Sequence, residues 1–477
     1  MNKYIGVDLG TSGLKLLLVA ADGSILDQTA LTYPVSYPRD GWSEQNPEDW
    51  FAALMRGFEQ LGARDVAGIS FGGQMHGLVA LDAAGEVVRP CILWNDGRTE
   101  RETEYLNTLP VAEYTGNMAF AGFTAPKLLW LRKNEEQNFA RTAKIMLPKD
   151  YLAYKLTGQF ATDYSDASGT LLLDVKNRRW SSEMCDICGI SAGQLPQLFE
   201  SYQPVGFVKR EICERFGWGK VVVAAGAGDN AAAAVGTGCV NAGDCNVSLG
   251  TSGTVFIASD KFVQSSNNAL HSFAHANGRY HLMGCILSAA SANKWWVGDI
   301  LGAGYDLPGA EALLGSNPVM FAPYLTGERC PHNDVGVRGA FVGLSPQTTR
   351  LHMSLAVLEG VAFALRDCLE LARSCGIAVR ASSVCGGGAR SALWQKIIAN
   401  VLNVELSTLK TEQGPAYGAA MLAMVACGEY ADVASAAAAI VSKRPSVAPE
   451  KGLAAAYNER YKKFRALYPA LKKWQGQ

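Results

Sequence analysis

Two short stretches that share five residues decide the fold of this chain. Residues 7–15 read VDLGTSGLK and residues 248–255 read SLGTSGTV, so LGTSG begins at Leu9 and again at Leu249, about half a chain later. Apolar, β-prone residues flank both copies, which predicts a strand, a turn of small residues and a second strand in each place. The sequence therefore predicts two similar lobes that each open with a hairpin.

The rest of the chain alternates between strand and helix patterns. Residues 48–62 have the apolar spacing of a helix, residues 66–73 read as a short strand ending in two glycines, and residues 353–374 form the longest amphipathic helix pattern. This alternation predicts α/β layers with parallel strands in each lobe. No linker-like stretch appears, and we expect the boundary in the turn at 241–244, which gives lobes of residues 1–240 and 241–477.

The composition is that of a globular protein with balanced charge. The chain has 477 residues, 48% of them apolar, with 43 basic against 44 acidic side chains, so nothing suggests a nucleic-acid or anionic-membrane surface. No run of about 20 apolar residues could span a bilayer. Asp8 also falls where a signal peptide needs its apolar run. Twelve scattered cysteines fit free thiols in a reducing cytosol, so a cytoplasmic protein is expected.

The familiar nucleotide-binding motifs do not fit. The only Gly-Lys pair, Gly219-Lys220, is followed by Val221 and lacks the upstream glycine of a P-loop. Stretches resembling G-x-G-x-x-G start at Gly226 and Gly386 but end in Ala231 and Ser391, and no acidic residue ends a following strand about 20 residues further on, as a dinucleotide site needs. The P-loop class is excluded and the dinucleotide class is disfavoured.

The two Gly-Thr-Ser-Gly turns suit a polyphosphate chain instead. Glycine permits close approach, and backbone N–H groups and hydroxyls supply donors. Asp8 ends the first strand and would face such phosphates, where a carboxylate needs a cation such as Mg²⁺ held by one carboxylate and waters. Lys15, on the returning strand, would add positive charge. The alternative for Asp8 is an aspartate that only hydrogen-bonds its own turn.

Three further places are candidates for a ligand site. Residues 386–389 (GGGA) follow a strand and precede a helix, which suits an adenosine or a phosphate, or is simply a tight turn. Asp229 and Asn230 precede an alanine-rich helix, so they read either as a helix N-cap or as a general base with its neighbour. His76 lies in a glycine-flanked loop after a strand, a better place for a ligand contact than for a core histidine.

A series of motifs, in order from residue 7 to about residue 420, resembles the FGGY carbohydrate kinases. The motifs are VDLGTSGLK, GQMHG, LWNDGR, GFTAPKLLWL, LPKDYLAYKLTG, TDYSDASGT, GAGDNAAAAVG, SLGTSGTV, GERCPHN, GGGARS and GPAYGAA. The resemblance implies two lobes of the actin and hexokinase type, each with a ribonuclease-H-like core, that close over ATP and a sugar. It also implies Mg²⁺-dependent transfer of the ATP γ-phosphate.

The resemblance further implies a substrate and a set of site residues. GQMHG together with WNDGR favours family members that phosphorylate the 5-hydroxyl of D-xylulose over kinases of glycerol, gluconate or ribulose. By position, Asp229 matches the catalytic base and Asp8 the residue tied to Mg²⁺ and phosphate. The expected sugar contacts are Met75, His76, Trp94 and Asn230, and the expected ATP contacts are Thr11, Ser12, Lys15, Gly250, Thr251, Gly388 and Ala389.

Two other functions stay open on the sequence alone. A related kinase for another pentulose or polyol shares most of these motifs. An actin- or Hsp70-like ATPase that drives a protein partner shares the duplicated hairpins, but it would not need the Met75-His76 loop or Asp229 beside a sugar. A homodimer also stays open.

Overall fold

Two mixed β-sheets with the same strand order organise the computed structural model, which describes residues 2–476. The core of the first sheet runs in the order β3 (Ile25–Thr32), β2 (Gly13–Ala20), β1 (Lys3–Leu9), β5 (Val66–Gly73) and β14 (Val222–Ala224). The core of the second runs β19 (Tyr280–Ile286), β17 (Gly253–Ser259), β16 (Cys245–Leu249), β22 (Ala381–Cys385) and β23 (Glu405–Thr408).

The pairing directions match as well as the order. In both sheets the first two pairings are antiparallel and the next two are parallel. Each LGTSG stretch forms the turn between the two central hairpin strands, β1–β2 or β16–β17. The prediction of two similar α/β lobes is therefore confirmed, with antiparallel hairpins beside the expected parallel strands. Additional strands extend the sheets: β13 (Pro204–Phe207), β15 (Ala227–Gly228) and β18 (His271–Ala274).

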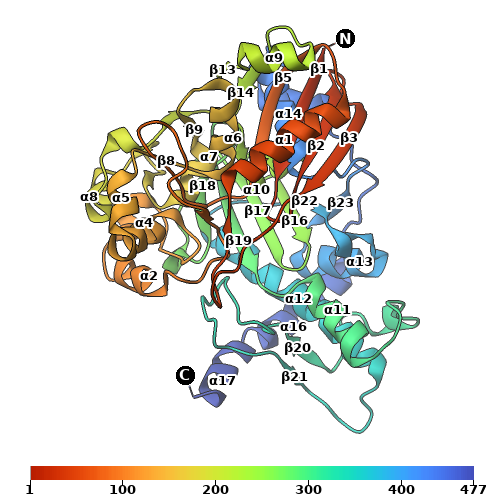
Figure 1. The fold of residues 1–477 in the computed structure, drawn as a ribbon. Coiled ribbons are helices and arrows are strands. Elements are labelled where there is room, and N and C mark those ends of the chain that lie inside the picture. The colour runs from red at the N-terminus through yellow and green to blue at the C-terminus, as the bar shows by residue number, and fades with distance from the viewer. Residues whose placement is uncertain (1, 477) are drawn as a thin grey trace.

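Helices cover the sheets, and two of them pack against each other on the first sheet. The first lobe carries α1 (Pro47–Leu61), α6 (Pro148–Thr157) and α9 (Arg210–Phe216), and the second carries α11 (Ala290–Lys294), α12 (Arg350–Ser374), α13 (Ala392–Leu402), α16 (Lys451–Phe464) and α17 (Leu467–Trp474). Helices α10 (Asp229–Gly236) and α14 (Pro415–Ala426) pack against each other, and α15 (Val433–Ile440) packs on α14. Figure 1 shows the blue helix α14 beside the red strands of the first sheet.

Two glycines allow the close approach of α14. A Cβ on Gly6 of β1 would lie 1.9 Å from the carbonyl oxygen of Ala416, and one on Gly418 would lie 1.8 Å from that of Ala232 in α10. Helix α14 therefore rests directly on β1 and on α10, and the end of the second half of the chain returns to the first sheet. The division at residue 240 stays a prediction.

An insertion lies between β5 and β13, at residues 74–203; its helix α6 and several of its strands pack in the core of the first lobe, and the rest forms a second hydrophobic core. Its other helices are α2 (Glu100–Asn107), α3 (Val111–Thr115), α4 (Thr124–Asn134), α5 (Glu136–Arg141), α7 (Tyr164–Ala167) and α8 (Ser182–Cys188). Its short strands are β6 (Val79–Leu81), β7 (Cys91–Ile92), β8 (Lys144–Met146), β9 (Ala161–Asp163), β10 (Leu173–Asp174), β11 (Arg179–Trp180) and β12 (Gln197–Phe199). Strand β4 (Glu44–Gln45) of the first lobe pairs with β7. In the second lobe, β20 (Met320–Ala322) pairs with β21 (Ala340–Val342). Phe273 of β18 joins the second hydrophobic core of the insertion, so the second sheet packs against the insertion.

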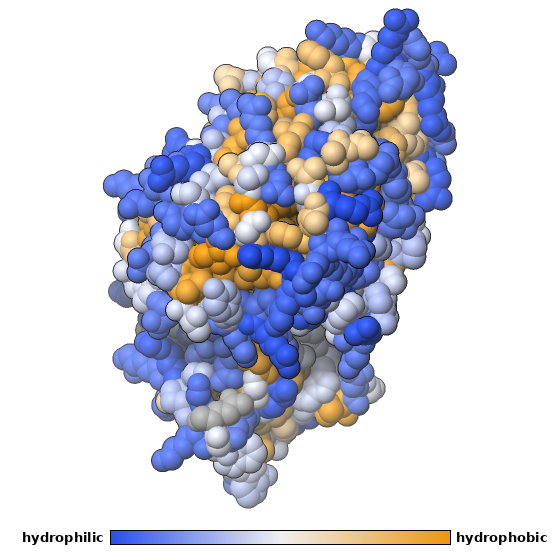
Figure 2. Space-filling view, turned by 60° about the vertical axis from the view of Figure 1, so that its left-hand side comes forward, coloured by the Kyte–Doolittle hydropathy of each residue, from blue (hydrophilic) through white to orange (hydrophobic). Residues whose placement is uncertain are grey.

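Hydrophilic residues cover most of the face drawn in Figure 2, with apolar residues gathered near its middle. Within residues 2–476, no helix is both long and apolar enough to cross a membrane. The cysteines are free thiols, including Cys185 and Cys188 of the single C-x-x-C.

Candidate active site

The first hairpin holds Asp8 next to Lys15 at the carboxyl end of β1. Asp8 pairs with Lys15 across the hairpin and with Gly72 of the parallel strand β5. The Gly10 N–H donates to the Gly13 carbonyl at 3.0 Å and closes the turn, so the turn does not need the Asp8 side chain. Lys15 Nζ donates to Gln413 Oε1. Ser12, at the tip, is exposed.

Two buried carboxylates, Asp8 and Asp229, have raised pKa values, and the charge of Asp229 disfavours ionisation of Asp8. Burial and then the Asp229 carboxylate raise the pKa of Asp8 to about 7, against the opposing charge of Lys15. Burial raises the pKa of Asp229 to about 6, against its hydrogen bonds from Asn230. A cation between these carboxylates and a phosphate would relieve this unfavourable charge.

The side chains fit a magnesium ion that keeps most of its water. Within residues 2–476, no group of three or more His, Cys, Asp or Glu side chains is arranged to hold a metal ion, so a cage made only of protein groups is not available there. Mg²⁺ is commonly bound by one or two carboxylates together with waters and substrate phosphates. Asp8 has the right chemistry for that arrangement, with the cation held through water.

Asp229 is the first residue of α10, and the N-cap of that helix is Gly228. The interpretation of Asp229 or Asn230 as the N-cap was therefore wrong by one or two positions. Asp229 Oδ1 accepts the Asn230 N–H at 2.7 Å and the Asn230 Nδ2–H at 2.8 Å. Asn230 thus holds one carboxylate oxygen of Asp229, and Oδ2 takes no part in these two bonds.

The tautomer of His76 follows from its contacts. His76 Nδ1 lies 2.6 Å from the Gly169 carbonyl oxygen, which can only accept, so Nδ1 carries the proton and Nε2 keeps a lone pair. The ring stacks on Phe123 with centroids 4.5 Å apart. Burial lowers the pKa of His76 to about 3, so the ring is neutral. Nε2 can therefore accept a hydrogen bond from a hydroxyl.

The backbone around His76 is held from the insertion. His76 has φ 70°, and its carbonyl accepts from Thr124 Oγ1 at 3.0 Å and from Lys127 Nζ at 2.9 Å. Lys127 also donates to the Gly122 carbonyl at 2.5 Å, and burial lowers its pKa to about 7. These contacts fix the loop that follows β5.

Met75 connects the His76 loop to Asp229. A Cβ on Gly228 would lie 2.8 Å from Met75 Sδ, so the methionine packs on the residue that precedes Asp229. Gly228 also pairs with Gly73 of β5 in the sheet. The structure therefore brings Met75, His76 and Asp229 into one place from segments about 150 residues apart.

Thr11 and Trp94 meet in a hydrogen-bonded network that the sequence did not predict. Trp94 Nε1 donates to Thr11 Oγ1 at 2.9 Å, and Thr11 Oγ1 donates to Gln74 Oε1 at 3.0 Å. Gln45 Nε2 donates to the Thr11 carbonyl at 2.7 Å, and Gln45 Oε1 accepts from Gln74 Nε2 at 3.1 Å. Gln74 belongs to the GQMHG motif, which was the available signal; Gln45 had none.

The second hairpin borders a cavity of about 1230 Å³ in the second lobe. Thr251 and Gly388 line it together with residues of α11 and the start of α13. The Thr251 carbonyl accepts from Ala289 N–H at 3.0 Å and Gly250 carbonyl from Ala290 N–H at 2.9 Å, which ties the hairpin to the start of α11.

The GGGA turn needs its glycines to approach this hairpin. Gly386 has φ 89°, and its Cβ would lie 2.7 Å from the Leu249 carbonyl oxygen; a Cβ on Gly388 would lie 2.9 Å from both Leu249 Cβ and the Trp394 ring. Ala389 is 4% exposed and lies in the hydrophobic core of the second lobe, so its side chain is turned away from the cavity.

The family models of known proteins match both halves of the chain. The N-terminal domain of the FGGY family of carbohydrate kinases matches residues 3–236, and the C-terminal domain of that family matches residues 245–427. The chain belongs to the FGGY family of carbohydrate kinases.

Individual relatives agree with this membership of the FGGY family. A xylulose kinase of Escherichia coli K12 is 41% identical, with 98% of this chain and 99% of the relative covered. A solved structure described as a xyloylose kinase from Brucella ovis has a TM-score of 0.94 and 42% identity, covering 99% of this chain and 100% of the other. A gluconate kinase structure from Lactobacillus acidophilus has a TM-score of 0.93 with 26% identity, covering 100% of this chain and 99% of the other.

Proposed function

We propose that this carbohydrate kinase transfers the γ-phosphate of ATP to the 5-hydroxyl of D-xylulose and releases D-xylulose 5-phosphate and ADP. The observation that carries the proposal is the contact between the Met75-His76 loop and the Gly228-Asp229 turn. A neutral histidine with a free Nε2 suits sugar hydroxyls, and a carboxylate beside it suits proton acceptance. Relatives named xylulose kinase support the choice of sugar.

Asp229 accepts the proton of the attacking hydroxyl. Its raised pKa, about 6, places the carboxylate close to neutrality, where a general base is both ionised and able to take a proton. The two Asn230 bonds hold Oδ1, which orients the carboxylate, and Oδ2 receives the proton. Met75 and His76 hold the sugar, and Trp94 and Asn230 border it.

The two hairpins hold the polyphosphate between them, and the GGGA turn receives the adenosine. Ser12, Lys15, Gly250 and Thr251 offer backbone N–H groups, hydroxyls and one ammonium to phosphate oxygens, while the cavity beside Gly388 accommodates the nucleoside. Asp8 would hold Mg²⁺. When bound, the ion neutralises charge on the transferred phosphate. Closure of the lobes would exclude water, a competing phosphate acceptor.

A kinase for another pentulose or polyol is not favoured, because relatives that are 36–42% identical to this chain are named xylulose kinase. The gluconate kinase structure, at 26% identity, shares the fold. The partner-driving ATPase is not favoured, since both FGGY models match. A cytoplasmic setting is part of the proposal, because free cysteines persist in a reducing compartment.

Release of ADP with a panel of sugars tests the proposed function. The panel contains D-xylulose, D-ribulose, gluconate, glycerol, xylitol and D-arabitol, each at equal concentration with Mg²⁺-ATP. We expect the highest kcat/KM for D-xylulose and little turnover without sugar. A higher kcat/KM for another member of the panel would transfer the proposal to that sugar.

A further inference from the structure

A buried ionic cluster lies beneath the turn that presents Asp229. The ammonium of Lys149, at the start of α6, lies 2.6 Å from Asp150 Oδ1, 2.9 Å from Asp163 Oδ1 and 3.7 Å from Asp166 Oδ2. All four side chains are inaccessible or nearly so, with at most 1% exposure. Burial disfavours charge on Lys149, but the surrounding carboxylates outweigh it and raise its pKa. A group of this kind gives little net stability, because the desolvation of its charges offsets their attraction.

The cluster contacts the segment before Asp229 at two points. Lys149 Nζ donates to the Ala225 carbonyl at 3.3 Å. Ser165 Oγ accepts the Gly228 N–H at 3.2 Å and donates to Asp163 Oδ2 at 2.5 Å. A Cβ on Gly73, the sheet partner of Gly228, would lie 2.7 Å from Lys149 Cβ, so the lysine packs closely beneath both strands.

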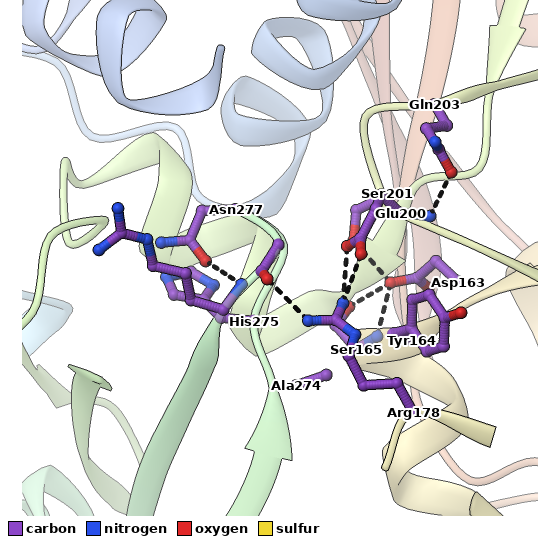
Figure 3. A network of polar contacts seen from close by, with 12 residues as sticks. Asp163, Tyr164, Ser165, Arg178, Glu200, Ser201, Gln203, Ala274, His275 and Asn277 are labelled. Carbon is purple, nitrogen blue, oxygen red and sulfur yellow. Dashed lines mark hydrogen bonds and ion pairs between the residues drawn. The ribbon is translucent and has the colours of Figure 1, made fainter. Parts of the chain in front are cut away.

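Asp163 is the common acceptor within the cluster. Its Oδ2 accepts from the Ser165 N–H at 2.8 Å, from Ser165 Oγ and from Ser201 Oγ at 2.6 Å. Figure 3 shows Ser165 and Ser201 converging on Asp163, with Arg178 and Glu200 nearby. Of the two hydroxyls, only that of Ser165 also bonds the backbone before Asp229; Ser201 reaches this segment through its own carbonyl oxygen, which accepts the Gly226 N–H at 3.0 Å.

We propose that Lys149, Asp163 and Ser165 are positioning residues that hold the Gly228-Asp229 turn in the geometry needed for proton transfer. The route runs from Lys149 to Asp163 by an ion pair, to Ser165 by a hydrogen bond, and to the Gly228 N–H. None of the three touches the reacting atoms. The inference rests on the proposed role of Asp229 and explains why three acidic groups and a lysine are buried here.

Rigid placement matters because a displacement of about 1 Å in a reacting group can reduce the rate by about 10²-fold. Asp229 is the first residue of α10. The first N–H groups of a helix have no acceptor in a preceding helical turn. The Ser165 contact with Gly228 therefore restrains the helix start at the residue next to the carboxylate.

Ser165→Ala and Ser201→Ala form a matched pair that tests the proposal. Both serines are buried, at 0% and 1% exposure, and both lose a hydroxyl bonded to Asp163 Oδ2, but only Ser165→Ala releases the Gly228 N–H. We expect kcat to fall about tenfold in Ser165→Ala and by less than about twofold in Ser201→Ala. The KM for ATP should not change in either, and their melting temperatures should be similar.

Hydrogen–deuterium exchange of the peptide covering residues 225–230 gives a readout that does not depend on turnover. Exchange of the Gly228 amide should become faster in Ser165→Ala and stay at the wild-type rate in Ser201→Ala. Ser165→Thr keeps the hydroxyl, so both the exchange rate of the Gly228 amide and kcat should stay close to the wild-type values. Equal kcat losses in the two alanine variants, or unchanged Gly228 exchange in Ser165→Ala, would overturn the proposal.

The experiment separates this proposal from the choice of sugar. Turnover is measured with whichever sugar gives the highest wild-type kcat/KM in the panel, so a preference for a sugar other than D-xylulose refutes the proposed function alone. If Asp229→Asn keeps wild-type kcat, then Asp229 is not the base, and the exchange result still reports whether Ser165 holds the turn.

Discussion

The two LGTSG hairpins have the same sequence and the same strand pairing but different neighbours. In the first, the Thr11 hydroxyl is bonded to Gln74 and Trp94, on the side of the proposed sugar site. In the second, the Thr251 carbonyl binds the start of α11, and its side chain is exposed at the cavity of the second lobe. The local sequence therefore determines the hairpin, while the surrounding chain determines what its hydroxyl can do.

The two lobes differ in acidic residues beside the hairpin and at the start of the following helix. The residue before LGTSG is Asp8 in the first copy and Ser248 in the second. Helix α10, which follows the first sheet, begins with Asp229, whereas α14, which follows the second, begins with Pro415. The carboxylates proposed for the reaction thus belong to the first lobe, and the second lobe offers a cavity of about 1230 Å³.

The largest effect is expected from Asp229→Asn. An amide cannot accept the hydroxyl proton, and loss of a general base typically reduces the rate by about 10²–10⁴-fold. We expect kcat to fall at least about 100-fold. Because burial raises the pKa of Asp229 to about 6, the ionised carboxylate destabilises the fold at neutral pH, so the melting temperature at pH 7.5 should not fall.

The pH profile of the wild type is the companion measurement. A base with a pKa of about 6 loses its acceptor form as the pH falls through that value, so kcat should decrease about tenfold between pH 7 and pH 5. Asp229→Asn should lose the part of this acid limb that Asp229 causes, and the limb that remains belongs to Asp8, whose pKa burial and the Asp229 carboxylate raise to about 7 in the wild type. Near-normal kcat in the variant would leave Asp229 without a catalytic role.

Asp8→Asn tests the acidic difference between the hairpins, with Ser248→Ala as the matched change in the second. The amide keeps the size of Asp8 but removes the charge that holds Mg²⁺ near the phosphates. We expect kcat at ordinary Mg²⁺ to fall by about 10²-fold, and raised Mg²⁺ to recover part of it. Binding of D-xylulose by calorimetry should stay near wild type. An equal loss in Ser248→Ala would remove the distinction between the lobes.

His76→Asn sharpens the assignment of the sugar side to the first lobe. Asparagine tolerates the positive φ of this position, and its Nδ2–H can still donate to the Gly169 carbonyl, but it has no equivalent of Nε2. The KM for D-xylulose should rise about tenfold, the typical loss when one substrate hydrogen bond is removed. The KM for ATP and the melting temperature should stay unchanged. A matching rise in the KM for ATP would mean that the loop serves both ligands.

The sequence predicted the features that depend on residues close together in the chain, and it missed those that join distant positions. The hairpins and the helices at 47–61 and 350–374 depend on residues close in the chain, and the patterns predicted them within a few residues. The N-cap of α10 was misplaced because Gly228, Asp229 and Asn230 are all acceptable caps, and only the backbone identifies the helix start. The Thr11 network joins positions 11, 45, 74 and 94, and no local pattern links them.

The smallest effect, and the most direct test of the comparison, comes from Thr11→Val and Thr251→Val. Valine has the shape of threonine without the hydroxyl, so each variant removes only the hydrogen bonds of one hairpin. Thr11 Oγ1 is already bonded to Gln74 and Trp94, so its loss should loosen the sugar side and raise the KM for D-xylulose about fivefold, the equivalent of about 1 kcal/mol. Thr251→Val should instead raise the KM for ATP by a similar factor, because its exposed side chain lines the cavity. If both variants raise the KM for ATP equally, then both hairpins bind the phosphates of ATP. The hydrogen bonds around Thr11 would then stabilise the first hairpin without contributing to sugar binding.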